Sequence, residues 1–115
     1  MNMELEGKIA VISGGSIGIG LAVAEALAEE GVHLALCARD EIRVSEQAQA
    51  IAGKYGVRAI GVKTDVSKAE EIAAFVQKVE ATFGGVDILI NNAGTGSNET
   101  IVDAADEKWQ YYWDL

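Results

Sequence analysis

The chain has 115 residues, of which 50% are hydrophobic and 23% are charged, and its net charge is −9, from 18 acidic and 9 basic residues. Domains typically run to about 100–150 residues, so the chain forms one domain or part of one. An acidic balance without a basic run argues against nucleic acid as a partner. The apolar stretches fall short of the roughly 18 residues that a membrane-spanning helix needs, and the N-terminus lacks a basic signal region, so we expect a cytoplasmic protein without a membrane partner.

The chain alternates short β-branched runs with longer helical patterns, which predicts an α/β fold. A first strand is expected at residues 8–13, where nearly every residue is apolar, as in a parallel strand that helices cover on both faces. A glycine-rich turn follows. An alanine- and leucine-rich helix is then expected over 18–30, with Gly31 at its C-terminal end.

The second strand-helix unit begins at His33. A strand is expected over 33–37, and Asp40 is placed to cap a helix over 41–55. Cys37, the only cysteine, cannot form an internal disulfide, and its apolar neighbours predict a buried structural residue. His33, the only histidine, has no nucleophile or metal-ligand spacing around it, so a structural role is expected for it too.

The third unit begins with a strand expected at 57–63. Ser67 and Glu70 then have the spacing of a capping box, which predicts a helix from that point to about residue 83. A fourth strand is expected at 86–90, and a helical pattern covers 103–115.

These elements predict a doubly wound parallel sheet in the order 3-2-1-4 with helices on both faces. The fourth strand of such a sheet, which contains Ile88, Leu89 and Ile90, would be an open hydrophobic edge. We therefore expect a further strand beside it, in a longer polypeptide.

The first turn between strand and helix reads Ser13-Gly14-Gly15-Ser16-Ile17-Gly18-Ile19-Gly20. Glycines let the backbone turn tightly and approach a phosphate closely, and the positive end of the following helix favours the negative charge. The spacing G-x-x-x-G-x-G differs from the commonest dinucleotide fingerprint and from the P-loop. The turn predicts a pyrophosphate site, with a plain connecting turn as the alternative.

Three motifs in sequence order resemble the short-chain dehydrogenase/reductase family: this glycine turn, Asp65-Val66 after the third strand, and Asn91-Asn92-Ala93-Gly94 after the fourth. The resemblance covers essentially the whole chain and implies a Rossmann-like fold that binds a nicotinamide dinucleotide. By this resemblance, Gly14, Ser16, Ile17 and Gly18 line the pyrophosphate and nicotinamide ribose, Asp65 and Val66 contact the adenine, and Asn91, Ala93 and Gly94 lie along the adenosine ribose and the inner edge of the cofactor.

Two of these motifs also have purely structural interpretations. By the resemblance, the carboxylate of Asp65 would accept from the exocyclic amine of the adenine. The alternative is that Asp65 only caps a turn. Asn91 and Asn92 are also typical of a pair that fixes two adjacent strand ends. The family usually has a threonine where Ser13 stands, and the serine keeps the hydroxyl that fixes the turn.

The end of the second strand selects between the two nicotinamide cofactors. A carboxylate there binds the ribose 2′-hydroxyl of NAD, whereas a neutral residue followed by arginine accommodates the 2′-phosphate of NADP. Ala38 takes the place of the carboxylate, and the guanidinium of Arg39 is suited to pair with phosphate. NADP(H) is therefore expected, with NAD as the less favoured alternative. Asp40 would be the ribose ligand if the register were shifted by two residues, and Ile17 stands where the family has a second basic marker for NADP.

The resemblance implies an oxidoreductase that transfers hydride between NADP(H) and a small alcohol or carbonyl substrate, in a homo-oligomer that is a dimer or tetramer. The family's Tyr-x-x-x-Lys pair does not occur in residues 1–115, since Tyr55 is followed four residues later by Ala59 and Tyr111 by Leu115. We therefore expect this chain to be the N-terminal dinucleotide-binding part of a single Rossmann domain, without the catalytic residues.

Two other functions are compatible with a glycine-rich first turn. A non-catalytic dinucleotide-binding or redox-sensing protein on the same fold is the main alternative. A methyltransferase-type nucleotide binder is less favoured, because it needs an acid where Ala38 and Arg39 stand.

Overall fold

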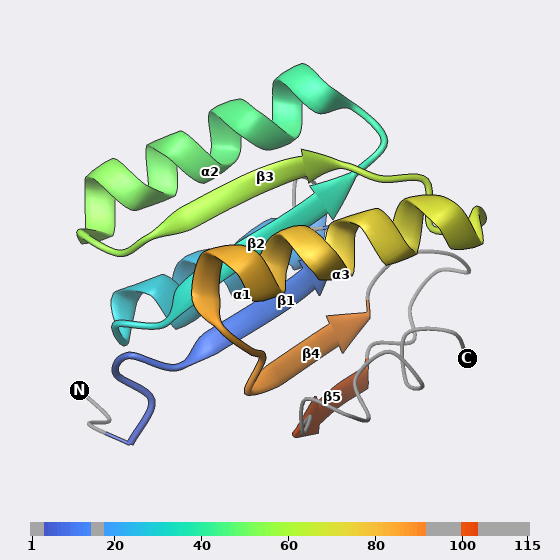
Figure 1. Ribbon diagram of the computed structural model, residues 1–115. Coiled ribbons are helices and arrows are strands. Elements are labelled where there is room, and N and C mark those ends of the chain that lie inside the picture. Colours follow the sequence, from blue (N-terminus) through green and yellow to red (C-terminus); the bar gives the residue numbers. More distant parts are fainter. Residues whose placement is uncertain (1–3, 15–17, 92–99, 104–115) are drawn as a thin grey trace.

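The computed structural model describes residues 4–14, 18–91 and 100–103. Five strands form one sheet, with α1 and α2 on one face and α3 on the other (Figure 1). In chain order the elements are β1 (Ile9–Ser13), α1 (Gly18–Glu29), β2 (His33–Ala38), α2 (Glu41–Tyr55), β3 (Ala59–Lys63), α3 (Ala69–Phe83), β4 (Ile88–Asn91) and β5 (Thr100–Asp103).

The strands lie in the order β3-β2-β1-β4-β5. The first four are parallel, which confirms the expected order 3-2-1-4 and the doubly wound topology. β5 pairs antiparallel with β4, with Asp103 opposite Ile88. The expectation of a helix from residue 103 onward is therefore wrong at Asp103, which ends a strand, and residues 104–115 lie outside the described part of the chain.

The apolar strands fill a core on each side of the sheet. Alternate residues of one strand point to opposite faces, so Ala10 and Ile12 of β1 pack toward α1 and α2, while Val11 packs toward α3. β2 behaves in the same way, and its residues 34–37 are all fully buried. This burial on both faces explains why the sequence of these strands is almost continuously apolar.

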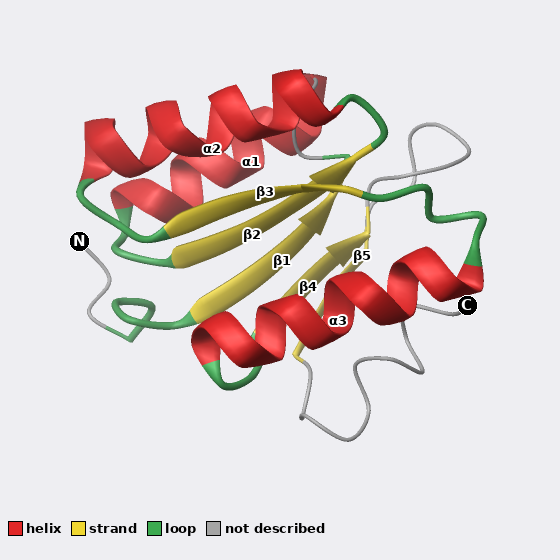
Figure 2. Cartoon of the chain, turned by 45° about the horizontal axis from the view of Figure 1, so that its top comes forward, coloured by secondary structure: helices red, strands yellow, loops and turns green. Residues whose placement is uncertain are grey.

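Helix α2 lies unusually close to the edge strand β3. A methyl group added at Gly61 would stand 2.2 Å from the carbonyl oxygen of Val44 and 3.0 Å from the amide nitrogen of Ser45. Only a residue without a side chain fits against the backbone of α2 at this point. The contact holds α2 over the part of the sheet where β2 and β3 run side by side (Figure 2).

The helix ends follow the expected signals in all but one case. Gly56 and Gly84 end α2 and α3 in the left-handed conformation, with φ of 71° and 86°. The carboxylate of Asp40 caps α2 by accepting from the amide of Arg43.

The expected capping box at Ser67 is wrong. The N-cap of α3 is Lys68, and no side chain caps that end of the helix. The reason is competition, because the amide and the hydroxyl of Ser67 both donate to the carboxylate of Asp65.

Three strands begin later than expected: β1 at Ile9 rather than at residue 8, β3 at Ala59 rather than at residue 57, and β4 at Ile88 rather than at residue 86. Just before β3, the amide of Arg58 donates to Nδ1 of His33 at 3.0 Å, and its carbonyl accepts from the amide of Leu34 at 2.9 Å. The carboxylate of Asp87 accepts from the amide of Ile9 at 2.9 Å, and β4 begins after it. β4 also continues one residue further than expected, to Asn91.

The structural roles expected for Cys37 and His33 are confirmed. Cys37 is fully buried in β2, and burial raises the pKa of its thiol, which keeps the thiol protonated and unreactive. His33 stacks on Phe83 with ring centroids 6.4 Å apart, and the guanidinium of Arg58 lies 4.8 Å from the same ring. In the described part of the chain, no helix is long and apolar enough to cross a membrane.

Candidate functional site

The carboxyl ends of the four parallel strands meet at one edge of the sheet. Ser13, Ala38, Lys63 and Asn91 are the last residues of β1, β2, β3 and β4. From β1 the chain proceeds to β2 and β3 on one side, while β4 lies on the other, so the strand order reverses at the end of β1 (Figure 1). Open α/β sheets bind their ligands at such a switch point, outside the carboxyl ends of the strands.

A hydrogen bond between side chains joins the two strands at the switch point. The hydroxyl of Ser13 donates to Oδ1 of Asn91 at 2.9 Å, and the two residues are register partners in the β1–β4 ladder. Ser13 is fully buried. This bond agrees with the interpretation that Asn91 fixes two strand ends, whereas Asn92, the other member of the expected pair, lies outside the described residues. The contact of Asn91 with a cofactor stays a prediction.

The glycine turn begins and ends with residues in the left-handed region. Gly14 has φ of 70°, and its amide donates to the carbonyl of Cys37 at 2.8 Å, which ties the start of the turn to β2. Gly18 opens α1 with φ of 54°. A side chain at Gly18 would meet no atom within 4 Å, so the backbone conformation, and not crowding, requires glycine there. Ser16 and Ile17 lie outside the described residues.

Two large apolar side chains are exposed at this same edge. Ile19, in the first turn of α1, is 59% exposed, and Ile42, in the first turn of α2, is 71% exposed. The sequence interpretation assigned neither of them to the site. One sequence signal could have identified them: each is an isoleucine in the first turn of a helix, at a position that does not face the core.

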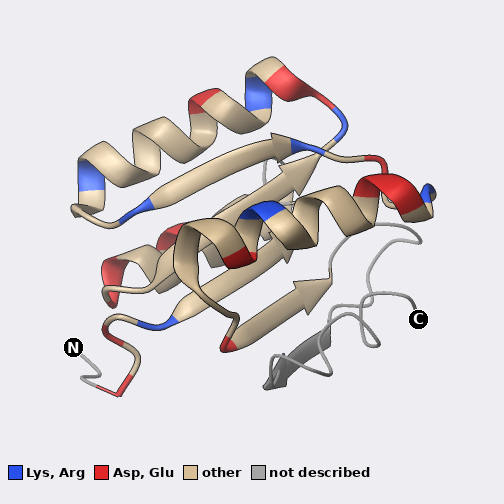
Figure 3. Ribbon diagram, viewed as in Figure 1, with Lys and Arg blue, Asp and Glu red and all other residues tan. Residues whose placement is uncertain are grey.

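The end of β2 carries Arg39, which is exposed. The amide of Thr64 donates to the carbonyl of Ala38 at 2.8 Å, so the connections that leave β2 and β3 remain side by side beyond the ladder. Lys63 pairs in register with Ala38 and is also exposed. Basic residues therefore lie at the carboxyl ends of both strands (Figure 3).

Asp40 occupies the position that sequence reasoning left open between a helix cap and a ribose ligand. Its Oδ1 accepts from the amide of Arg43 at 3.1 Å, in the geometry of an N-cap. We expect Asp40→Ala to lower the free energy of unfolding by about 1 kcal/mol, the usual cost of losing a cap, and to leave NADH binding unchanged. Urea denaturation and NADH titration measure the two effects. A marked loss of NADH binding without a loss of stability would show that Asp40 is a ribose ligand.

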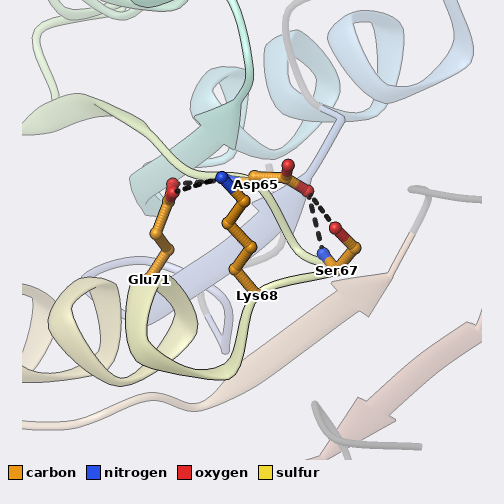
Figure 4. Close-up of polar contacts among 4 residues, drawn as sticks. All are labelled: Asp65, Ser67, Lys68 and Glu71. Atoms are coloured by element: carbon orange, nitrogen blue, oxygen red, sulfur yellow. Dashed lines mark hydrogen bonds and ion pairs between the residues drawn. The ribbon is translucent and has the colours of Figure 1, made fainter.

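Asp65 follows β3 and lies in a network with the start of α3 (Figure 4). Its Oδ1 accepts from the amide and the hydroxyl of Ser67, at 3.0 and 2.7 Å. Its own amide donates to Oε1 of Glu71 at 2.9 Å, and Oε2 of Glu71 lies 3.9 Å from Nζ of Lys68.

This network lowers the pKa of the Asp65 carboxyl, a group that is ionised at neutral pH even at its ordinary pKa. The hydrogen bonds from Ser67 lower the pKa of the Asp65 carboxyl, and the positive charges of Lys68 and Arg39 lower it further. The geometry agrees with the turn-cap interpretation of Asp65, and its contact with adenine stays a prediction. Val66, the next residue, is half-buried against the core under α3.

Five of the expected site residues thus lie at or just beyond the carboxyl edge of the sheet: Gly14, Gly18, Arg39, Asp65 and Asn91. Val66 anchors the connection to α3. Ala93 and Gly94, like Ser16 and Ile17, lie outside the described residues. In the described residues, no group of His, Cys, Asp and Glu side chains is arranged to hold a metal ion. The edge combines a glycine turn, exposed basic residues and an ionised carboxylate, a set that suits a phosphorylated nucleotide.

Comparison with known proteins gives consistent results. The chain is 39% identical over 107 residues to the 3-oxoacyl-[acyl-carrier-protein] reductase FabG of Escherichia coli, which covers 93% of this chain and 42% of that protein. It is 39% identical over 114 residues to an uncharacterized oxidoreductase of Staphylococcus saprophyticus, which covers 98% of this chain and 48% of the relative. The chain therefore spans less than half the length of these relatives.

Solved structures resemble the chain along the same stretch. The L-sorbose reductase of Gluconobacter frateurii, complexed with NADPH and L-sorbose, is 56% identical with a TM-score of 0.80, over 100% of this chain and 44% of that one. An alcohol dehydrogenase of the archaeon Thermococcus sibiricus, complexed with 5-hydroxy-NADP, is 45% identical with a TM-score of 0.69, over 71% of this chain and 35% of that one. The family model described as short chain dehydrogenase matches residues 8–115. The chain thus belongs to the short-chain dehydrogenase family of oxidoreductases, as the three sequence motifs indicated.

Proposed function

We propose that this chain binds NADP(H) at the carboxyl edge of its sheet and serves as the dinucleotide-binding part of a single Rossmann domain. The whole protein then transfers hydride between NADP(H) and a small alcohol or carbonyl compound. In this proposal Gly14, Ser16, Ile17 and Gly18 line the pyrophosphate side, Asp65 and Val66 contact the adenine, and Asn91, Ala93 and Gly94 lie along the adenosine ribose.

The observation that carries the proposal is the end of β2. In this fold the residue there meets the adenosine ribose, and an acid selects the 2′-hydroxyl of NAD. Here Ala38 ends the strand, Arg39 follows it in an exposed position, and Asp40 is engaged at the cap of α2. A guanidinium without a competing carboxylate at the ribose position suits a 2′-phosphate.

The remaining geometry supports the same ligand. The glycines at both ends of the first turn adopt left-handed conformations beside the N-terminus of α1, a geometry that suits the close approach of a pyrophosphate. The exposed side chains of Ile19 and Ile42 offer apolar contact to the rings of a dinucleotide. The two solved relatives described above hold NADPH and 5-hydroxy-NADP, respectively.

The relatives also inform the wider proposal. Reductases and an alcohol dehydrogenase among them act on carbonyl or alcohol groups, as their names state. We therefore extend the proposal to a small-molecule substrate of this class. From the sequence analysis we also propose a cytoplasmic location and a dimer or tetramer as the working assembly.

Hydride transfer is tested by incubating the intact protein with NADPH and a panel of small ketones, ketoses and aldehydes. Loss of the absorbance of the reduced nicotinamide, with matching formation of the alcohol, is the expected result. If NADPH binds tightly and no carbonyl compound in the panel is reduced, the non-catalytic dinucleotide-binding protein becomes the better interpretation.

A further inference from the structure

The carboxylate of Asp65 is held in one orientation by Ser67. The amide and the hydroxyl of Ser67 both donate to Oδ1, at 3.0 and 2.7 Å (Figure 4). The other oxygen, Oδ2, makes no hydrogen bond within residues 4–14 and 18–91. One oxygen of the carboxylate is thus fixed, and the other is presented as an acceptor.

The backbone of Asp65 is held by α3. Its amide donates to Oε1 of Glu71 at 2.9 Å, and its carbonyl accepts from the amide of Lys68 at 3.0 Å. The ammonium of Lys68 lies 3.9 Å from the other oxygen of Glu71. Side chain and backbone of Asp65 are therefore both oriented by residues that follow it within six positions.

We infer that Ser67 is a positioning residue for adenine recognition, whose two donors hold Oδ1 of Asp65 so that Oδ2 accepts from the exocyclic amine of the adenine. The inference rests on the proposed function, because the contact between Asp65 and adenine is part of that proposal. Its physical basis is preorganisation: a carboxylate that is already oriented loses less conformational freedom when the ligand binds.

A simple helix-capping role does not account for Ser67. The N-cap of α3 is the next residue, Lys68, and the hydroxyl of Ser67 donates to Asp65 instead of accepting from the first amides of the helix. Removing this hydroxyl leaves the start of α3 with the same backbone hydrogen bonds. Loss of the hydroxyl also raises the pKa of the Asp65 carboxyl toward its ordinary value, because its bonds from Ser67 are the largest cause of the lowered pKa.

The test compares two cofactors that differ at the group Asp65 is inferred to recognise. One is NADPH, and the other is reduced nicotinamide hypoxanthine dinucleotide phosphate, in which a carbonyl oxygen replaces the exocyclic amine. In the intact protein, Ser67→Ala is expected to raise the Kd for NADPH about fivefold, the typical cost of immobilising one side chain on binding, and to leave the Kd for the hypoxanthine cofactor unchanged.

Two further variants serve as controls. Ser67→Thr keeps a hydroxyl on the same carbon and is expected to bind NADPH as the wild type does. Glu70→Gln removes the charge of an exposed residue in the first turn of α3 and is expected to change neither Kd.

The outcomes separate this inference from the proposed function. Equal weakening of both cofactors by Ser67→Ala shows a general structural role and overturns the inference. The inference is also overturned if Ser67→Ala binds NADPH as tightly as the wild type while Asp65→Asn binds NADPH more weakly. In that case the contact between Asp65 and adenine still stands. If the wild type binds the two cofactors equally well, the adenine contact itself is refuted. If it binds neither cofactor, the proposed function fails.

Discussion

Replacing Gly61 with alanine is expected to lower the free energy of unfolding by about 3 kcal/mol, because overpacking in a fixed site typically costs 1–3 kcal/mol and the obstacle here is backbone. The added methyl group would stand 2.2 Å from the carbonyl oxygen and 2.6 Å from the carbonyl carbon of Val44. A flexible side chain would move aside, but these atoms belong to the backbone of α2, close to the N-terminal end of the helix. The substitution therefore displaces α2 from β3, or distorts the strand.

Gly53, which lies in α2 itself, provides the matched control for the substitution at Gly61 in β3. It lies in the last turn of α2, is exposed, and a methyl group there would meet no atom within 4 Å. Gly53→Ala is expected to stabilise the protein by about 0.5–1 kcal/mol, since alanine loses less backbone entropy in a helix. Urea denaturation followed by circular dichroism compares both variants with the wild type. A Gly61→Ala protein as stable as the wild type would contradict the close packing of α2 on β3.

Arg39→Ala is expected to weaken NADPH binding by about 10- to 100-fold, because hydrogen bonds to charged groups contribute roughly 1.5–3 kcal/mol. The affinity for NADH, which lacks the 2′-phosphate, is expected to stay unchanged. Arg39 is exposed directly after β2, so its removal does not disturb the core. Fluorescence titration of the two cofactors measures the ratio of the affinities.

Arg58→Ala is the control for the loss of one arginine. Arg58 lies just before β3, at the opposite edge of the sheet, where its guanidinium donates to the carbonyl of Thr82 at 2.7 Å. This variant is expected to keep the wild-type preference between NADPH and NADH. An Arg39→Ala protein with that same preference would refute the assignment of Arg39 to the 2′-phosphate.

The parallel part of the fold was predictable because its signals are local. Short stretches of sequence were enough to predict the apolar strands, the glycines that end helices and the cap at Asp40. The parallel order followed from the alternation of strand and helix. A strand beside β4 was expected, but only in a longer polypeptide. That residues 100–103 form it was missed, because antiparallel pairing with β4 depends on a partner elsewhere in the chain. The need for glycine at position 61 was not predictable either, since it arises from the close approach of α2 to Gly61 in the folded chain.

For the candidate site, the sequence predicted which strand ends hold the candidate binding residues, but not which contacts their side chains make. Topology alone brings Arg39, Asp65 and Asn91 to one edge, so their grouping was predictable. Ser67 was misassigned because the capping-box spacing was present, while the competing acceptor on Asp65 became evident only from the folded geometry. Ile19 and Ile42 were overlooked because exposure is a property of the folded chain.

We propose above that the carboxyl edge of this sheet binds NADP(H) through its first glycine turn and the arginine after β2. Titration of the intact protein with NADPH and, separately, with NADH, followed by nicotinamide fluorescence, tests it most directly. We expect saturable binding of one NADPH per chain with a lower Kd than for NADH. Absence of saturable NADPH binding, or a clear preference for NADH, would contradict it.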